Sequence, residues 1–505
     1  MEILMFAQIG EAIIMLFERA TLLAIVGGSI YGLSIGAIPG LTATMAAALL
    51  VPFTFFMAPL PAMAAIISMS AMAIFAGDIP ATLVRMPGTP SSAAYTEDSY
   101  RLTQRGLAGQ ALGVDVICSA IGGILGSIVL MLAAPILAEY AMRFTSFEYF
   151  WLAVLGLSSA VVVSSASLVK GGIALMLGLL FSTVGIDITL GFPRFTFGSV
   201  ELTGGIDFIP AMIGLFGVSE VLRNVMRVET LRFATSEVPK RIFGGIGTIV
   251  SKYKAVIARS SAIGVAIGIL PGAGADIAAW VSYAITRNTS GDREQFGKGH
   301  IEPILAGTSA NNAALAGAWV PALVFGIPGD SITAILIGVL MMKGLRPGPM
   351  IFEQQPVLIY GIYAAFLLAN LLLVPFGYLA IRSSGLLLRV PKNVLLPGIL
   401  LFSIVGAFAI NNSIFDVGIM LFMGVLGYIL EANQVPVAPV VLGIVLGPIV
   451  EQNFMISVIK VQWNLWQFVT RPVSAVLCLA AVIMWTYPFL GYFFRRFQAR
   501  RSISS

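Results

Sequence analysis

Long runs of apolar residues alternate with short polar connections along the whole chain of 505 residues. Runs such as 21–56, 60–85, 107–138 and 356–381 are long enough to cross a bilayer as helices, since about 20 residues suffice. At that length the chain has room for roughly ten to twelve transmembrane helices. The pattern therefore predicts an all-α polytopic membrane protein.

Two of these runs are interrupted by the same motif, Gly-x-x-x-Gly-x-(Ile/Leu)-Pro-Gly. It occupies 32–40 and 264–272, which lie 232 positions apart (264 − 32). A second motif starts with Pro-Ala and ends with Pro-Gly at 80–88 and 321–329, 241 positions apart (321 − 80). Proline and glycine both weaken a helix interior. The repetition predicts two homologous halves that contain Pro-Gly-broken or re-entrant helices, as in secondary transporters.

Charge divides the chain further and suggests how the halves are oriented. The predicted parts are an N-terminal segment 1–19, a first half 20–222, a connector 223–259, a second half 260–455, and a C-terminal helix with a tail at 456–505. The connector and the tail are rich in Lys and Arg, which favours the cytoplasmic side. The acidic segment 1–19, a candidate interfacial helix, favours the opposite side. The halves are therefore expected to be inverted relative to each other.

Composition excludes several classes of function. Only 10% of the residues are charged, against roughly 25% in soluble proteins, so a large soluble catalytic domain does not fit. The net charge of +5 comes from basic residues in loops beside apolar runs, without the aromatic residues of a nucleic-acid surface. His300 is the single histidine, which excludes a His-based metal centre or catalytic triad. We expect no enzyme activity, no metal site and no nucleic-acid partner.

The Pro-Gly breaks are where polar chemistry gathers. A helix that restarts after such a break points free N–H groups and its positive dipole end into the gap, where a carboxylate can bind. The candidate substrate site comprises Pro39, Gly40, Thr42, Thr44, Arg85, Pro87, Gly88, Thr89, Ser91 and Ser92 in the first half, and Pro271, Gly272, Gly274, Thr308, Ser309, Asn311, Asn312, Pro328, Gly329 and Ser331 in the second. The alternative for any one hydroxyl is a bond to its own helix.

Four charged residues near the breaks are functional candidates. Arg85 is a candidate clamp for a substrate carboxylate, or a snorkelling arginine at a helix end. Asp276, Asp78 and Asp330 are candidates for binding the coupling ion, Na⁺ or H⁺, with Asp276 preferred. The alternative for Asp78 is that it pairs with Arg85, seven residues later.

Several motifs in order resemble one transporter family. They lie at 38–42 (Ile-Pro-Gly-Leu-Thr), 86–92 (Met-Pro-Gly-Thr-Pro-Ser-Ser), 105–113, 270–276 (Leu-Pro-Gly-Ala-Gly-Ala-Asp), 296–299, 309–313 (Ser-Ala-Asn-Asn-Ala), 326–329 (Gly-Ile-Pro-Gly), and 442–448 with Glu451. Together, across about residues 20–455, they resemble the large membrane subunit of the tripartite tricarboxylate transporters.

The resemblance implies a permease of the bacterial inner membrane that imports a small organic carboxylate with an ion gradient. It also implies a small four-helix membrane subunit and a periplasmic substrate-binding protein as partners, and no cofactor beyond the coupling ion. This chain differs from the family at Thr308, where glutamate is usual, and at Arg85, where a neutral residue is usual. Substrate or coupling ion is therefore expected to differ from those of citrate-type members.

Two other functions stay open at this point. An anion channel would show a ring of charges or a selectivity filter, which the sequence does not display. An intramembrane aspartyl protease would use two facing carboxylates, for instance Asp78 and Asp276. The chain lacks the Gly-x-Gly-Asp arrangement of such proteases at both positions.

Overall fold

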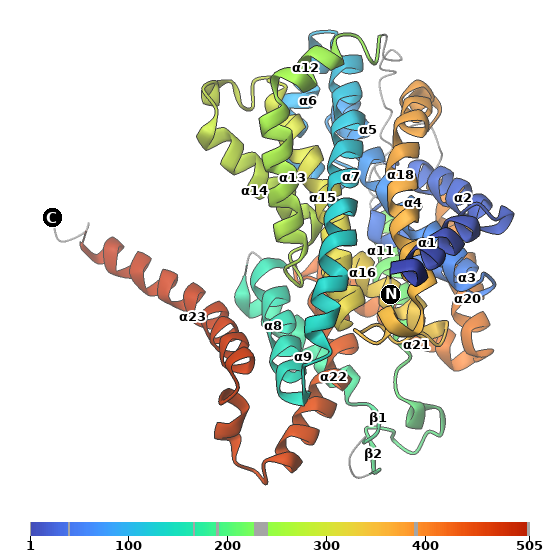
Figure 1. The fold of residues 1–505 in the computed structure, drawn as a ribbon, viewed down its shortest axis with the longest axis vertical. Helices are drawn as coiled ribbons and strands as arrows, with labels where there is room; N and C mark the ends of the chain where they lie inside the picture. The colour runs from blue at the N-terminus through green and yellow to red at the C-terminus, as the bar shows by residue number, and fades with distance from the viewer. Residues whose placement is uncertain are drawn as a thin grey trace. The chain divides into compact units, whose positions relative to one another are not determined.

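The computed structural model describes residues 2–38, 41–164, 167–187, 191–226, 241–387 and 392–501, and its elements are almost entirely helical. The expected all-α fold is confirmed (Figure 1). The chain forms two compact units. Unit 1 contains residues 1–139 and 207–429, and unit 2 contains residues 140–206 and 430–505. These units are not the repeat halves, because unit 1 takes most of both halves.

Unit 1 contains most of the helices. In chain order they are α1 (Glu2–Leu16), α2 (Arg19–Gly36), α3 (Ala43–Phe55), α4 (Pro59–Ala76), α5 (Asp78–Val84), η1 (Ser92–Ala94), α6 (Thr96–Gln104), α7 (Ala108–Ala141), α10 (Phe208–Met212), the π-helix η3 (Ile213–Val218), α11 (Ser219–Met226), α12 (Ile246–Lys252), α13 (Lys254–Gly268), α14 (Gly274–Thr289), η4 (Arg293–Gln295), α15 (Glu302–Phe325), α16 (Ser331–Met342), α17 (Ile351–Gln354), α18 (Pro356–Arg382), α19 (Ser384–Leu387), α20 (Lys392–Asn411) and α21 (Ile414–Ala432). The last residues of α7 and α21 belong to unit 2.

Unit 2 is built from the ends of both halves. It contains α8 (Ser146–Ser164), α9 (Leu168–Ser182), β1 (Gly185–Ile186), β2 (Pro193–Arg194), η2 (Glu201–Gly204), α22 (Ala438–Lys460), η5 (Leu465–Val469) and α23 (Pro472–Arg501). The two short strands pair antiparallel, with Gly185 opposite Arg194. Arg194 also binds the carboxylate of Glu451 through both terminal nitrogens, at 2.6 and 3.0 Å, which ties this hairpin to α22.

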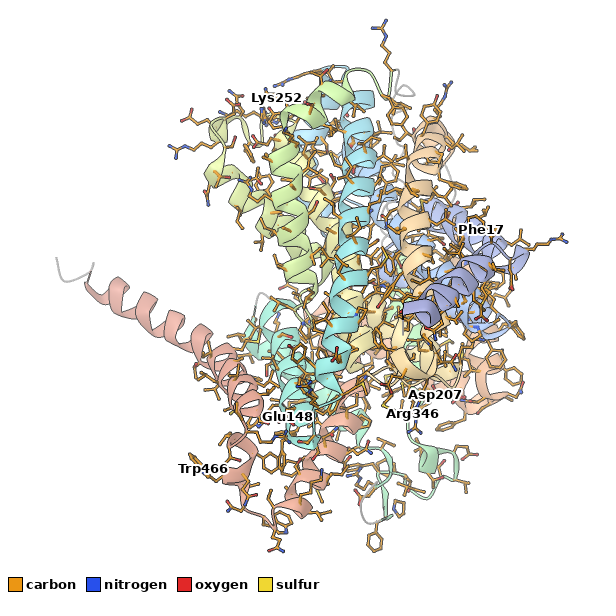
Figure 2. All side chains as sticks on the ribbon, in the orientation of Figure 1. Phe17, Glu148, Asp207, Lys252, Arg346 and Trp466 are labelled. Atoms are coloured by element: carbon orange, nitrogen blue, oxygen red, sulfur yellow. The ribbon has the colours of Figure 1, made fainter. Side chains whose placement is uncertain are left out.

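Seven helical segments of the described chain are long and apolar enough to span a bilayer, and seven shorter apolar helices accompany them. The expected total of ten to twelve spans stays a prediction. Two of the short helices, α3 and α16, directly follow Pro-Gly breaks and are too short to cross alone. Figure 2 shows Lys252 at one end of unit 1 and Arg346 at the opposite end. The apolar helices of unit 1 therefore lie between two polar ends.

Corresponding helices of the two halves pack in the same way. In the first half α2 packs on α4, and in the second α13 packs on α15. A Cβ added to Gly32 would overlap the carbonyl oxygen of Met69, and one added to Gly264 would overlap that of Ala310. These pairs are related by the motif spacings, 232 (264 − 32) and 241 (310 − 69). The repeated motifs therefore pack alike in the two halves, while their homology and inversion stay predictions.

The buried helices of the two halves also end alike. Helix α5, which follows α4, ends at Arg85 with a left-handed backbone (φ 59°), and α15 ends at Gly326 with φ 68°. The N–H of Met86 donates to the carbonyl of Pro80, and that of Ile327 donates to the carbonyl of Pro321, both at 3.2 Å. Donors and acceptors of the two bonds are each 241 positions apart (327 − 86 and 321 − 80). Each half thus closes its last turn with the same left-handed cap.

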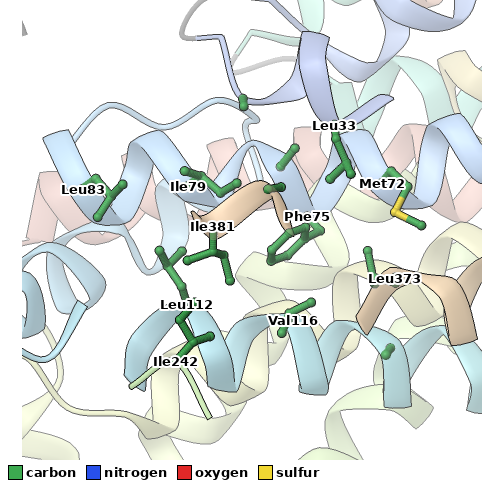
Figure 3. Packing of buried hydrophobic residues seen from close by; sticks show 14 of the residues in the cluster. Leu33, Met72, Phe75, Ile79, Leu83, Leu112, Val116, Ile242, Leu373 and Ile381 are labelled. Atoms are coloured by element: carbon green, nitrogen blue, oxygen red, sulfur yellow. The ribbon is translucent and has the colours of Figure 1, made fainter. Parts of the chain in front are cut away.

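An apolar cluster holds the Pro87-Gly88 break of the first half in place. Figure 3 shows Phe75 of α4, Ile79 of α5, Val116 of α7 and Leu373 of α18 packed together. Each of these four side chains is completely buried. Four helices from distant parts of the chain therefore fix the position of α5, which leads into the break.

Replacing Gly32 by Ala tests the close packing of α2 on α4. The new methyl group meets the carbonyl of Met69, so we expect destabilisation on the order of 1–3 kcal/mol, as for overpacking in other cores. Gly27→Ala on the same helix is the matched control, because a Cβ there meets open space. Thermal denaturation in detergent should give a lower midpoint for Gly32→Ala only. Equal midpoints for both variants would contradict this packing.

Candidate functional site

Thr89 and Ser92 form the turn that follows the Pro87-Gly88 break. The N–H of Ser92 donates to Thr89 Oγ1, and the N–H of Thr89 donates to Ser92 Oγ, both at 3.2 Å. Just before them, the N–H of Gly88 donates to the carbonyl of Gly77 at 3.0 Å. The two hydroxyl groups therefore satisfy backbone groups that the break releases from the helix.

Ser91, between them, is the point where the two halves meet. Its N–H donates to Asp276 Oδ1 at 3.1 Å, and its Oγ accepts a hydrogen bond from Asn311 Nδ2 at 2.9 Å. The same Oγ lies 2.9 Å from Thr89 Oγ1. Ser91 and Asn311 are 1% exposed. Four of the predicted site residues, two from each half, are thus joined by direct hydrogen bonds.

Helix α14 forms the solvent-exposed side of this site. Its first residue, Gly274, has φ +63°, and Asp276 follows in the first turn with its side chain exposed. One turn later the indole N–H of Trp280 donates to the carbonyl of Pro90 at 3.2 Å. Trp280 is 47% exposed although it is large and apolar. Asp276 and Trp280 therefore present a carboxylate and a ring beside the Ser91 turn.

A side-chain cap satisfies the backbone after the Pro328-Gly329 break of the second half. Asp330 Oδ1 accepts the N–H and the hydroxyl of Thr333, each at 2.8 Å, which forms a capping box on α16. A Cβ added to Gly274 would lie 2.9 Å from Cβ of Asp330, so α14 and α16 start close together. Asp330 thus has a structural role at the start of α16.

Several predicted site residues form hydrogen bonds with helix backbone, which is the alternative role expected for such groups. Thr308 Oγ1 donates to the carbonyl of Ile304 at 2.8 Å, and Ser309 Oγ donates to that of Leu305 at 2.6 Å, both within α15. Thr42 accepts the N–H of Met45 as the N-cap of α3. Asn312 Nδ2 donates to the carbonyl of Ser119 at 3.1 Å, which links α15 to α7. These groups stabilise helices and do not face Ser91.

The remaining candidates are distributed around the breaks. Thr44, Pro271, Gly272 and Ser331 are half-buried, Gly88, Pro328 and Gly329 are buried, Pro87 is exposed, and Pro39 and Gly40 lie outside the described residues.

Arg85 does not face the break. Its guanidinium pairs with Glu97 of α6 at 2.8 Å, and its side chain is 60% exposed. The hypothesis that Asp78 pairs with Arg85 is wrong, because Asp78 accepts a hydrogen bond from the hydroxyl of Tyr95 at 2.8 Å. The left-handed cap turns the Arg85 side chain outward, away from the buried face of α5.

Asp98 on α6 anchors a loop of the second half. Its carboxylate accepts the N–H groups of Gly297, Gly299 and His300, at 2.9, 2.9 and 3.1 Å. Burial raises the pKa of Asp98, and these three donors offset part of that rise. At neighbouring Glu97 the hydrogen bond from Arg101 lowers the pKa. Asp98 therefore positions the loop that precedes α15, the helix that carries Asn311.

Sequence reasoning missed three residues of this region, namely Tyr95, Asp115 and Trp280. Asp115 carried a usable signal, because a carboxylate inside a long apolar helix is a functional candidate by itself. It was not selected because α7 contains no Pro-Gly break near it. Tyr95 and Trp280 stand out only once α4, α14 and α15 are assembled.

Comparison with known families agrees with this architecture. The family model described as "Tripartite tricarboxylate transporter TctA family" matches residues 22–442. The chain belongs to this family. It is therefore a multi-pass membrane protein of a transporter family whose systems contain further subunits. The resemblance seen in the sequence motifs is confirmed.

Two relatives of this TctA-family chain come from Agrobacterium vitis. One is described as an uncharacterized 52.8 kDa protein in the TAR-I ttuC' 3' region, and is 35% identical over 91% of this chain and 92% of its own length. The other, an uncharacterized protein in the TAR-II ttuC' 3' region, is 37% identical over 42% of this chain and 87% of its own length. No solved structure matches.

The left-handed cap at Arg85 yields a stability prediction. Arg85→Gly and Arg85→Ala both remove the exposed ion pair with Glu97, which contributes at most about 1 kcal/mol. Only Gly relieves the left-handed backbone, so Arg85→Gly should be more stable than Arg85→Ala by about 1 kcal/mol. The order of their thermal midpoints in detergent checks this. An alanine variant as stable as the glycine variant would contradict it.

Proposed function

We propose that this chain is the permease of a secondary active transporter. It imports a small organic carboxylate, a di- or tricarboxylate or a related anion, across the bacterial inner membrane with a Na⁺ or H⁺ gradient. A periplasmic binding protein delivers the substrate, and a small membrane subunit completes the complex. Family membership supports the transporter class. The Ser91 site supports the chemistry of the substrate.

The meeting of both halves at Ser91 is the observation that carries this proposal. The turn presents a backbone N–H, a hydroxyl and the amide of Asn311 within one group of hydrogen bonds. All three are donors suited to a carboxylate, and the N-terminus of α14 adds its positive dipole end. In this structure the protein's own carboxylate, Asp276, accepts the Ser91 N–H. A substrate carboxylate would compete with Asp276 for that donor.

Competition between two carboxylates explains why an ion gradient is needed. Two negative charges about 4 Å apart repel by about 4 kcal/mol at an effective dielectric constant near 20. A proton or Na⁺ on Asp276 removes this repulsion and frees the Ser91 N–H. Binding of the cation therefore favours binding of the anion, which couples the two fluxes. Movement of one half's helices against the other would then expose the site to either side.

The protease alternative has no geometric support. Asp78 accepts a hydrogen bond from Tyr95, whereas Asp276 accepts one from Ser91, so each carboxylate has a partner of its own. A protease would need these two groups to face each other across a peptide bond. The channel alternative differs from the permease in its kinetics, because a permease saturates with substrate and a channel does not.

Uptake into proteoliposomes tests the proposed function. The chain is reconstituted with its small subunit and binding protein, and labelled carboxylates are offered under separate Na⁺ and pH gradients. Asn311→Ala should raise the half-saturating concentration about tenfold or more, because a hydrogen bond to a charged group contributes about 1.5–3 kcal/mol. Asp276→Asn should uncouple uptake from the gradient.

Ser70→Ala is the matched control for these variants. Its hydroxyl is buried in α4 and donates to the carbonyl of Ile66 in the same helix, so its loss should leave uptake unchanged. Uptake of no carboxylate by folded wild-type complex would contradict the proposed function. Uptake that rises linearly with concentration would support a channel instead.

A further inference from the structure

Two carboxyl groups outside the Ser91 site face each other in the core of unit 1. Asp78 lies in the first turn of α5, and Asp115 lies in the second turn of α7. Each is 1% exposed. Both belong to helical segments that are apolar enough to span a membrane. A carboxylate at such a depth is costly unless it has a function.

Apolar residues enclose the pair on both faces of α7. Leu112 and Val116 belong to the cluster that includes Ile79 of α5 (Figure 3). Val114 and Cys118 belong to a second cluster on the other side of the helix. Apolar side chains therefore surround the two carboxyl groups, and burying an unpaired charge among them costs free energy.

Each carboxyl group of the pair accepts one hydrogen bond from a neighbouring hydroxyl group. The hydroxyl of Tyr95 donates to Asp78 Oδ1 at 2.8 Å, and that of Ser119 donates to Asp115 Oδ1 at 3.3 Å. The two carboxyl groups also lie within hydrogen-bonding reach of each other. The second oxygen of each, Oδ2, is buried and receives no bond from any donor in the described chain.

A proton is the ligand that this arrangement fits. Two ionised carboxylates in contact inside an apolar core repel each other, whereas one proton between them removes one charge and makes a strong hydrogen bond. Na⁺ needs several oxygen ligands, and the described chain contains no group of three or more His, Cys, Asp or Glu side chains that could hold a metal ion. In the described chain neither group forms an ion pair with Lys, Arg or His.

We infer that Asp78 and Asp115 form the proton-binding site of this chain, and that their proton crosses the membrane with the carboxylate. This inference rests on the proposed function. The pair takes one proton from the outer solution and releases it to the inner one in each cycle. H⁺ is then a coupling ion of this chain, carried by the pair in addition to the cation that neutralises Asp276 at the Ser91 site.

Tyr95 connects the pair to the Ser91 turn. Ser91 is the N-cap of η1, and Tyr95 is its C-cap, so one short helix joins the two residues. The ring of Tyr95 packs against Gly307 of α15, four residues before Asn311. A carboxylate that shifts the Ser91 turn therefore shifts the Tyr95 hydroxyl on Asp78. Loss of that donor makes the ionised pair less stable, which strengthens proton binding.

The groups facing the pair set its response to pH. Tyr95 and Ser119 donate to it, and the Cys118 thiol lies nearby on α7. Asp276 of α14 acts on Tyr95 from a greater distance. The two hydroxyl donors stabilise the ionised form of the pair, whereas burial and the mutual repulsion of the carboxylates favour retention of one proton.

Infrared spectroscopy of the purified full chain tests the proton directly. At neutral pH the wild-type spectrum should contain the carbonyl band of a protonated carboxyl group that is absent from Asp115→Asn. In that variant the new amide donates to Asp78, so the ionised carboxylate no longer needs a proton. Asp78→Asn is the second variant, and should lose the same band. A band of unchanged intensity in both folded variants would overturn the inference.

Transport by the same two variants, in the complete reconstituted complex, tests the role of that proton. An inward pH gradient should stimulate wild-type uptake, and this stimulation should disappear in Asp78→Asn and Asp115→Asn. Carboxylate counterflow, which needs no net proton movement, should persist in both. Stimulation retained in either variant, or a wild type driven by Na⁺ alone, would overturn the inference. Absence of wild-type uptake would instead overturn the proposed function, while the infrared band still decides the proton site.

Discussion

Backbone groups released by a helix break inside a bilayer must find partners within the protein, and the rest of this structure depends on that constraint. The first half meets it with the left-handed cap at Arg85 and the reciprocal bonds of Thr89 and Ser92. The second half meets it with the cap at Gly326 and the capping box of Asp330. Both solutions place polar groups where an uninterrupted helix would have none. The candidate site is thus a direct consequence of how the breaks are stabilised.

Negative charge is the second organising feature. The charged side chain that touches the Ser91 turn is a carboxylate, and a buried pair of carboxyl groups lies beyond Tyr95. A site for an anion that is itself acidic is useful only if a cation or a proton neutralises it first. In this account the coupling of the two fluxes is electrostatic, and needs no long-range signal. Tyr95 provides a short structural link between the carboxylate site and the proton site.

The sequence predicted those features of the fold that depend on residues close together in the chain. Apolar runs gave the helical membrane fold, and the recurring Pro-Gly motifs predicted the homologous halves that pack alike through Gly32 and Gly264. Asn311 and Thr308 lie one turn apart on α15, and sequence alone gave them equal standing. Only the position of Ser91 distinguishes them, because Asn311 reaches it while Thr308 bonds to its own helix. The Asp78–Arg85 pairing was wrong and Asp115 was missed for the same reason, since Arg85 pairs with Glu97 of α6 and Asp115 lies near Asp78 of α5.

The most direct test of the account is a disulfide cross-link between the two halves at Ser91. The double variant Ser91→Cys with Asn311→Cys, in a chain with Cys118 and Cys478 replaced by alanine, is oxidised mildly in native membranes. We expect that the cross-link forms, since Ser91 Oγ lies 2.9 Å from Asn311 Nδ2, and that a saturating transported carboxylate slows its formation. Failure to form the cross-link, or a rate that no carboxylate changes, would contradict the claim that both halves build one carboxylate site.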